Sequence, residues 1–400
     1  MTGYRENLRA SREFTINLTI FSCLPLYIAR SFHLQMIPIV RAARRLDSSG
    51  LMHPKTTAGA AFSMTPRIPS RLKAGLLVGA LLTAGHAYAA DADGLLVYNA
   101  QHEGLTKAWV EGFTRDTGIK VTLRNGDDSE MGNQLVQEGQ ASPADVFLTE
   151  NSPAMALVDN AGLFAKVAPT TLEQVAAAYR PTHGNWVGIA ARSTVFVYNP
   201  AKLQQADLPK SLLDLANPAW KGRWAASPAG ADFQAIVSAV LELKGEAATL
   251  EWLKGMKSNA SLYRGNSAVL KAVNAGQVDS GVIYHYYSFV DQAKTGENSK
   301  NTALHYFKHQ DPGAFVSLSG GAVLASSKHQ EQAQAFLKWI TSAKGQAVLG
   351  SGKSFEYAVG LGAQSNPKLV PLAELDAPKV DAARLNSKKA VDLMTQAGLL

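Results

Sequence analysis

The chain has 400 residues, of which 46% are hydrophobic and 18% are charged. This is a globular composition with room for two domains, and the lack of repeats and low-complexity tracts excludes solenoids and disordered proteins. The formal net charge is +7, but residues 1–90 hold 11 Lys and Arg against 3 Asp and Glu, whereas residues 91–400 hold 28 against 29. The larger part therefore lacks the basic excess typical of nucleic-acid binding, and the only cysteine, Cys23, lies outside it.

The segment that begins at Met64 has the three parts of a secretory signal: a basic start, an apolar run and a cleavage site. Arg67, Arg71 and Lys73 precede an uncharged apolar run at residues 74–85, and Ala87-Tyr88-Ala89 supplies small residues for cleavage. The run is shorter than the roughly 20 residues that a membrane-spanning helix needs. We therefore predict that residues 64–89 are a cleaved signal peptide for export, with a periplasmic location if the cell has two membranes, although a buried first helix would also fit the apolar run.

Signal peptides begin at the N-terminus, yet 63 residues precede Met64. We expect residues 1–63 to be an upstream extension that results from a start codon assigned too early. The alternative is a membrane anchor in the uncharged stretch from Phe14 to Ala29, which is short and contains Pro25. No cysteine follows the signal-like run, so lipid attachment there is excluded.

Strand and helix patterns alternate at the start of the remaining chain. The apolar run at 95–99 favours a strand, Leu105, Trp109 and Phe113 recur at helical spacing, and Gly118 ends that helix. A strand at 119–123, a helix at 131–138 ending at Gly139, and a strand at 144–148 follow. This β-α-β-α-β order predicts a parallel sheet with helices on its faces.

A second unit with the same alternation follows. We predict strands at 193–198 and 279–284, an extended segment at 314–324, and helices at 233–244, 267–274, 330–341, 344–349 and 387–397. The fold class is therefore α/β, with two lobes of similar pattern, each a mostly parallel sheet flanked by helices. We assign residues 91–194 plus 317–365 to the N-terminal lobe and 195–316 plus 366–400 to the C-terminal lobe, with a ligand cleft between them.

Chemically capable side chains follow three of the predicted strands. His102 comes after the first strand, Glu150 after the strand at 144–148, and Tyr286 and Tyr287 after the strand at 279–284. Ligands in open α/β sheets bind beyond the carboxyl ends of the strands, so these loops are expected to converge. Phenolate and carboxylate oxygens are hard donors, imidazole also accepts iron, and a trivalent cation would favour ionisation of a tyrosine. Ferric iron is the natural candidate.

Each of these residues also has an ordinary structural interpretation. His102 can be a capping or surface residue, and Glu150, next to Asn151-Ser152-Pro153, can be a loop carboxylate or helix start. Adjacent residues of a strand point to opposite faces, so both tyrosines reach one ion only if they lie on a turn or a first helical turn. Zinc would be signalled by Cys and His clusters and calcium by an Asp-rich loop, and the sequence has neither pattern.

Several blocks of the sequence resemble the periplasmic ferric-ion-binding proteins of ABC-type iron(III) transport. They are VYNAQHEG, SPADVFLTENSPA, RSTVFVYN, RGNSAVLKAV and the tyrosine pair followed by HQDPGA. The resemblance spans nearly the whole chain beyond the signal peptide. It implies a two-lobed type II periplasmic binding protein that holds one ferric ion in the cleft between its lobes. It implies that His102, Glu150, Tyr286 and Tyr287 are the metal ligands.

The resemblance also implies a synergistic anion, such as phosphate or carbonate, at a helix N-terminus. The matching segment is Ala229-Gly230-Ala231, and we expect Gly230, Ala231, Asn266 and Arg192 to bind the anion. Ala229 replaces the hydroxyl residue of the family and Tyr284 stands where the family has Asn, so the identity of the anion stays open. We interpret Tyr284 as a core residue; the role of His285 is open.

The expected function is periplasmic capture of ferric iron and delivery to an inner-membrane ABC permease and its ATPase, by a monomer with no enzymatic activity. The lobes would close about a hinge near residues 193–195 and 314–317. One rival keeps the fold but binds an organic solute, a polyamine or a sugar, through Trp186, Trp220 and Trp224. A second rival is a secreted hydrolase that uses Glu150 as base and His102 as acid, although GxSxG, HExxH and P-loop motifs are missing.

Overall fold

The computed structural model describes residues 94–400. The expectations for the upstream extension at 1–63 and the signal peptide at 64–89 lie outside the described residues. Within residues 94–400, no helix is both long enough and apolar enough to cross a membrane.

The first lobe is built from the predicted β-α-β-α-β unit. Strand β1 (Gly94–Asn99) pairs in parallel with β2 (Lys120–Asn125) on one side and with β3 (Val146–Leu148) on the other. The connecting helices are α1 (Glu103–Thr117) and α2 (Asp128–Glu138), and α3 (Ser152–Asn160) follows β3. Helix α1 ends where predicted, at Gly118, because its φ of 76° is the left-handed conformation that glycine adopts without strain.

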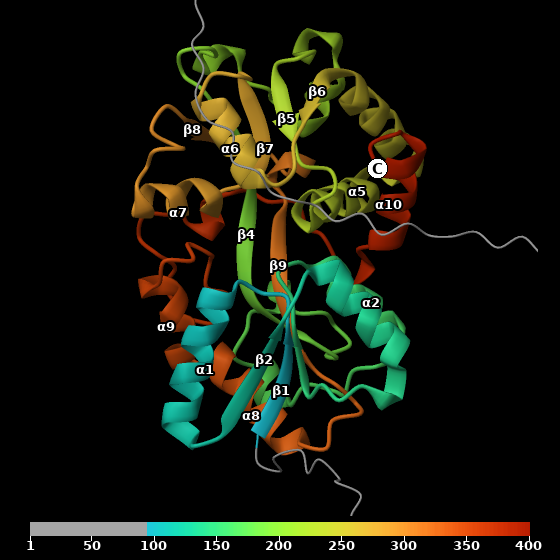
Figure 1. The fold of residues 1–400 in the computed structure, drawn as a ribbon, viewed down its shortest axis with the longest axis vertical. Helices are drawn as coiled ribbons and strands as arrows, with labels where there is room; N and C mark the ends of the chain where they lie inside the picture. Colours follow the sequence, from blue (N-terminus) through green and yellow to red (C-terminus); the bar gives the residue numbers. More distant parts are fainter. Residues whose placement is uncertain (1–93) are drawn as a thin grey trace, which may run out of the picture. The chain divides into compact units, whose positions relative to one another are not determined.

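Two long strands run up to the junction of the lobes, and one of them, β4, continues into the second lobe (Figure 1). Strand β4 (Val187–Tyr198) is buried over almost its whole length, and its first half pairs antiparallel with β9 (Val316–Val323). From Thr194 onward β4 pairs instead with β7 (Ser280–Tyr284). The sequence pattern predicted only residues 193–198 of β4, because the Gly and Ala residues at its start carry a weak strand signal.

The second lobe repeats the alternation of strands and helices. Strand β5 (Trp224–Ala226) pairs in parallel with β7 and with β6 (Ala260–Leu262), while β8 (Ala303–His305) pairs antiparallel with β4. Its main helices are α5 (Ala231–Asn259), α6 (Asn266–Asn274) and α7 (Tyr286–Lys294). Helix α5 extends well past the predicted 233–244, with a break at Gly245, where φ is 78°.

The sheet order is β2-β1-β3-β9-β4-β7-β5-β6. The outer pairs are parallel, as expected, whereas β9 and β4 run antiparallel to their neighbours, so the sheet as a whole is mixed. The parallel strands of each lobe end toward the junction of the two lobes (Figure 1). Loops that follow these strands are thereby brought to one region.

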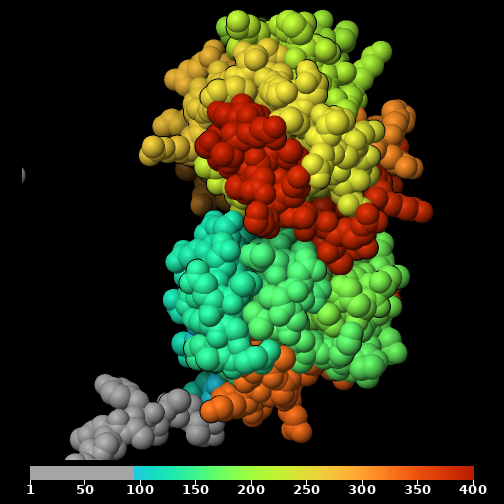
Figure 2. Space-filling view, turned by 90° about the vertical axis from the view of Figure 1, so that its right-hand side faces the viewer, coloured from blue at the N-terminus to red at the C-terminus, as the bar shows by residue number. Residues whose placement is uncertain are grey.

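The C-terminal part of the chain returns to both lobes. Helices α8 (Gln330–Thr341) and α9 (Ala343–Ser351) contact α1, while α10 (Ser387–Gln396) packs on α5. Figure 2 shows this last segment, in red, lying across both lobes. The short helices are α4 (Pro169–Leu172) and the 3-10 turns η1 (Gly139–Ala141), η2 (Ala177–Tyr179), η3 (Gln205–Asp207), η4 (Leu212–Ala216), η5 (Pro218–Trp220), η6 (Pro312–Ala314), η7 (Leu372–Glu374) and η8 (Ala382–Arg384).

Candidate metal centre

The structure brings all four predicted metal ligands together. His102 is the residue before α1, Glu150 lies in the turn between β3 and α3, and Tyr286 and Tyr287 open α7 directly after β7. The tyrosines thus occupy a first helical turn, where neighbouring side chains diverge by about 100° instead of the 180° of a strand, so that both can reach one site. Their rings stack at a centroid distance of 4.3 Å.

Direct contacts join the side chains across the two lobes. His102 Nε2 lies 3.0 Å from Glu150 Oε1, and the Tyr286 hydroxyl donates a hydrogen bond of 2.7 Å to the same oxygen. The His102 ring also meets the edge of the Tyr286 ring at a centroid distance of 4.8 Å. One carboxylate oxygen is therefore shared by an imidazole and a phenol that are almost two hundred residues apart in sequence.

A buried carboxylate behind His102 fixes the orientation of its ring. His102 Nδ1 lies 2.6 Å from Glu356 Oε1, which leaves Nε2 facing Glu150. Burial lowers the pKa of His102, but the charges of Glu150 and Glu356 outweigh burial and raise it to about 10. Burial in turn raises the pKa of Glu150, and the charge of His102 overcomes this effect and lowers it to about 2. Without metal, the pair is ionised at neutral pH.

Asp232 is a further acidic residue of the site, which the sequence did not single out. Its carboxylate accepts hydrogen bonds from Tyr287 OH at 3.0 Å and Tyr286 OH at 3.3 Å, and from the amides of Asn151 at 3.0 Å and Asn266 at 2.8 Å. Burial first, and then the charge of Glu150, raise the pKa of Asp232 to about 6. An acidic residue in a first helical turn is so common that its sequence position carried no signal.

Three of the residues predicted to bind an anion lie around the side chain of Asp232, in the place where an anion from solution was expected. Gly230 caps α5 and Ala231 is its first residue, as expected, and Asp232 comes next. Asn266 begins α6 and donates its amide to the Asp232 carboxylate. The side chain of this chain's own Asp232 thus lies among the groups that the resemblance assigned to an exogenous anion.

Arg192 lies in the interior and is fully buried. Its Nη2 pairs with Glu356 Oε2 at 3.0 Å and donates to Ser319 Oγ at 2.8 Å, whereas Nε and Nη1 have no partner within the described part of the chain. The guanidinium carbon is 5.9 Å from the centre of the Tyr286 ring. Arg192 is therefore a fixed positive charge beneath the tyrosines, and it helps to hold Glu356 behind His102.

Tyr284 and His285 tie the tyrosine pair to the shared strands. Tyr284 is fully buried, as expected for the last residue of β7, and its hydroxyl contacts Asn151 Oδ1 and the Asp232 carbonyl, each at 3.3 Å. His285 Nδ1 accepts from the Ser193 amide at 3.1 Å, and Nε2 donates to the Phe355 carbonyl at 2.8 Å. Burial lowers the pKa of His285 to about 4, so the ring is neutral at physiological pH.

The phenols need a cation before they can ionise. Burial, then the charges of Asp232 and Glu150, raise the pKa values of Tyr286 and Tyr287 far above 10. Within residues 94–400, no three His, Cys, Asp or Glu side chains are arranged to hold a metal ion. Oxygen donors of this kind suit a small, highly charged cation. The positive charge of such a cation would favour loss of the phenol protons.

The tryptophans of the organic-solute alternative do not reach the site. Trp186 and Trp224 are fully buried, and Trp220 is 8% exposed and packs edge-on against Phe196. All three belong to the hydrophobic cores of the lobes. Their expected role in stacking on a solute is wrong, because an apolar indole gains more from burial in the core than from exposure in a cleft.

Two α/β lobes joined through strand β4, with hard donors converging between them, define a type II periplasmic binding protein. The sequence profile of bacterial extracellular solute-binding proteins matches residues 108–355. An Fe(3+)-binding periplasmic protein of Serratia marcescens is 74% identical over 338 residues, 84% of this chain and all of that protein. The major ferric iron-binding protein of Neisseria meningitidis is 38% identical, over 81% of this chain and 97% of its own length.

A solved structure agrees with these relatives. Iron-bound HitA from Pseudomonas aeruginosa is 42% identical and superposes with a TM-score of 0.72, covering 77% of this chain and all of that one. The chain belongs to the bacterial extracellular solute-binding proteins, and within them to the periplasmic ferric-ion-binding proteins. Membership places it among transport proteins rather than enzymes, which removes the hydrolase alternative.

Proposed function

We propose that this protein captures ferric iron between its lobes and delivers it to an inner-membrane ABC permease. The proposed ligands are His102, Glu150, Tyr286 and Tyr287, joined by Asp232. The observation that carries the proposal is the convergence of the two phenols on the carboxylates of Glu150 and Asp232, at 2.7 and 3.0 Å. The half-buried carboxylate of Glu150 and the buried carboxylate of Asp232, beside two phenols, form a strongly anionic, oxygen-rich site once the phenols lose their protons.

The Asp232 carboxylate takes the part of the synergistic anion in this proposal. It stands at the N-terminus of α5, where the backbone favours negative charge, and the amides of Asn151 and Asn266 hold it in place. An anion bound within the protein needs no second ligand from solution. We therefore infer that phosphate or carbonate is not required for iron binding, and that Gly230, Ala231 and Asn266 position Asp232.

Closure of the lobes would assemble the site. We infer the hinge near residues 193–195 and 314–317, and the lobe boundaries given above, because β4 exchanges β9 for β7 between Ser193 and Thr194. His102 and Glu150 come from the first lobe, and the tyrosines and Asp232 from the second. Binding energy then favours the closed form, which a permease distinguishes from the open one.

Export and partners complete the proposal. A signal peptide at residues 64–89 would carry the protein to the periplasm. The relative from Serratia marcescens is named as a periplasmic protein, which supports this location. There the protein would act as a monomer and present its closed form to a permease driven by an ATPase.

Iron titration with and without phosphate tests this assignment. The apo protein should develop a visible absorption band at one ferric ion per chain, from phenolate coordination, with an affinity that added phosphate does not change. Asp232→Ala should bind iron weakly in phosphate-free buffer and regain much of its affinity in millimolar phosphate, because the anion fills the vacated place. The exposed Asp392→Ala on α10 is the matched control. A wild-type protein that forms no band contradicts the ferric site, and one that needs phosphate contradicts the role of Asp232.

A further inference from the structure

His285 is a buried imidazole that the proposed function does not use. It lies between β7 and the tyrosine pair that opens α7, and its ring stacks on Tyr357 at a centroid distance of 4.7 Å. The His285 backbone N–H donates to the Ser193 carbonyl at 3.0 Å, and the Ser193 N–H donates to Nδ1 of the ring at 3.1 Å. His285 is thereby fixed to β4 at the point where that strand exchanges β9 for β7.

The geometry defines which nitrogen of the His285 ring carries the proton. Nδ1 accepts a hydrogen bond from a backbone N–H, so the proton of the neutral ring is on Nε2. Nε2 donates this proton to the Phe355 carbonyl at 2.8 Å. By the lobe boundaries inferred above, Phe355 belongs to the first lobe and His285 to the second. The ring therefore joins a turn of the first lobe to the start of the helix that carries both phenols.

Phe355 has an unusual backbone conformation. Its φ is 55°, in the left-handed region that a residue with a side chain rarely adopts. Its ring is buried and stacks on Phe289 of α7 at a centroid distance of 5.7 Å. A conformation of this kind persists only where the surroundings fix it, and such residues concentrate at functional sites. Here the surroundings are α7 and His285, so the second lobe holds the turn at Phe355.

Glu356 follows this turn and lies between two fixed points of the backbone. On one side, the Phe355 carbonyl is held by the imidazole from the second lobe. On the other side, Tyr357 exchanges two backbone hydrogen bonds with Ala191 of β4, at 2.8 and 3.0 Å. The Glu356 carboxylate reaches His102 Nδ1 at 2.6 Å from this position. The place of the carboxylate behind His102 therefore depends on both attachments.

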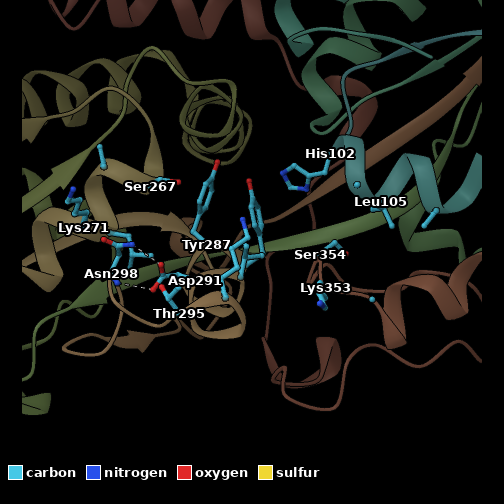
Figure 3. Close-up of a pocket in the computed structure, with 18 of the residues that line it drawn as sticks. His102, Leu105, Ser267, Lys271, Tyr287, Asp291, Thr295, Asn298, Lys353 and Ser354 are labelled. Atoms are coloured by element: carbon cyan, nitrogen blue, oxygen red, sulfur yellow. Dashed lines mark hydrogen bonds between the residues drawn. The ribbon is translucent and has the colours of Figure 1, made fainter. Parts of the chain in front are cut away.

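The held turn lies at the edge of the candidate metal centre. His102, Tyr287 and Ser354 line one pocket, and Figure 3 shows His102 and Tyr287 facing the same space, with Ser354 on the side of His102. Ser354 immediately precedes Phe355 in the chain. A small shift of this turn would therefore move the support of the histidine ligand relative to the phenols.

We infer that His285 is a positioning residue for iron binding, which holds the turn at Phe355 so that Glu356 keeps His102 aimed at the tyrosine pair. The inference rests on the proposed function, since it takes His102 and the tyrosines as metal ligands. One hydrogen bond then connects the two half-sites by a path that does not pass through the metal. The imidazole of the first lobe is thereby aligned with the phenols of the second before iron binds.

Two amide substitutions separate the two hydrogen bonds of the ring. In His285→Gln the amide nitrogen reaches the place of Nε2 and still donates to the Phe355 carbonyl. In His285→Asn the amide oxygen takes the place of Nδ1 and accepts only from Ser193. Each variant leaves one buried backbone group unpaired, so the midpoint of thermal unfolding should fall by similar amounts. Iron affinity, measured by competition with EDTA, should fall about tenfold in His285→Asn and stay close to wild type in His285→Gln.

The second lobe also offers a matched control for the loss of a histidine. His305 on β8 is half-buried, its Nε2 lies 3.2 Å from the Pro209 carbonyl, and its ring packs edge-on against Phe196 and Phe307. His305→Asn should lower stability and leave the iron affinity unchanged. Equal iron affinities in His285→Asn and His285→Gln would indicate a merely structural role for His285 and would overturn the inference.

A double-mutant cycle tests whether His285 acts through Glu356. The double variant His285→Asn, Glu356→Gln should bind iron as weakly as Glu356→Gln alone, because the second change has already removed the carboxylate that the first would displace. The visible band, which reports the phenolates, should keep its position in every variant. Additive losses of affinity, or a band that shifts in His285→Asn but not in Glu356→Gln, would show that His285 acts on the tyrosines directly and would overturn the inference.

A third variant keeps the test decisive if His285→Asn does not fold. His285→Phe retains a ring to stack on Tyr357 but makes neither hydrogen bond, and it should lose as much iron affinity as expected for His285→Asn. Unchanged affinity in His285→Phe, with a normal visible band in the wild type, defeats only the positioning role. A wild-type protein that forms no band with ferric iron defeats the proposed function and this inference with it.

Discussion

The two lobes contribute very different halves to the proposed iron site. The half-site of the first lobe, His102 and Glu150, is ionised before metal arrives: the pKa of the imidazole is raised to about 10 and that of the carboxyl lowered to about 2. In the half-site of the second lobe, burial raises the pKa of Tyr286, Tyr287 and Asp232, so the two phenols keep their protons at neutral pH and Asp232 begins to take up a proton near pH 6. Charge pairing determines the protonation of the first half-site, and burial determines that of the second.

This difference assigns different tasks to the two lobes. The first lobe presents a carboxylate of fixed charge, and metal binding there displaces only the proton shared with His102. The second lobe must release phenol protons and complete the ionisation of Asp232 before it binds iron. Acid therefore weakens the second half-site first, which makes it the natural place for iron release to begin.

The largest effect is expected from removing one phenol. Tyr286→Phe keeps the ring and its stacking on Tyr287 but removes the oxygen, and it should weaken ferric binding by several orders of magnitude and bleach the visible band. Tyr263→Phe in the same lobe, outside the site, is the control. An iron titration with an unchanged spectrum would show that the second half-site is assigned wrongly.

A smaller effect is expected behind the first half-site. Glu356→Gln keeps the side-chain shape but removes the charge that orients and protonates His102, and groups of this kind alter metal affinity by about 10- to 100-fold. The visible band should persist, because both phenols remain. Thermal unfolding should be followed in parallel, since Arg192 loses its buried partner. Unchanged iron affinity would mean that His102 does not need Glu356.

The pH dependence separates the half-sites further. With a pKa of about 6, Asp232 is about nine-tenths protonated at pH 5, so this group alone should lower iron affinity by about tenfold between pH 7 and pH 5. Asp232→Asn should remove that part of the slope, which affinity measurements at fixed ionic strength would detect. An identical slope in wild type and variant would contradict the titration of Asp232.

The apo protein should show the opposite response from the same group. The pKa of Asp232 is higher in the folded state than in the unfolded chain, so the folded state binds more protons between about pH 4 and pH 6. This contribution to the free energy of unfolding falls as pH rises through that window, by up to about 3 kcal/mol. Comparing the pH profiles of wild type and Asp232→Asn by chemical denaturation isolates it.

The smallest effect on binding is expected outside both half-sites. Trp220→Phe should change the iron affinity by less than about twofold, because Trp220 packs on Phe196 in the core of the second lobe. Its cost appears as stability, about 1–3 kcal/mol from lost packing. A large loss of ligand binding with unchanged stability would revive the tryptophan-lined site.

Much of the fold followed from local pattern. Apolar runs marked β1, β3 and β7, and helical spacing with a terminal glycine marked α1 and α2, since burial of one face imposes these periods on the sequence. The start of β4 and the second half of α5 were missed, the first because Gly and Ala are weak strand formers and the second because Gly245 interrupts the helical pattern. These parts are specified by packing rather than by local preference.

The candidate site also had a part that the sequence predicted and a part that it did not. The order of strands placed His102, Glu150 and the tyrosine pair at strand ends, and such ends share one edge in an open α/β sheet. Asp232 and Glu356 gave no such signal, because an isolated carboxylate, in a first helical turn or in a loop, is common in any sequence.

The sequence alone determined the alternation of strands and helices, the family and the donors at strand ends, since each depends on residues near one another or on a resemblance. Only the tertiary structure decided that Asp232 stands among the residues expected to hold an anion and that Glu356 lies behind His102. Those relations join residues far apart in the chain, and burial and charge act through space rather than along the sequence.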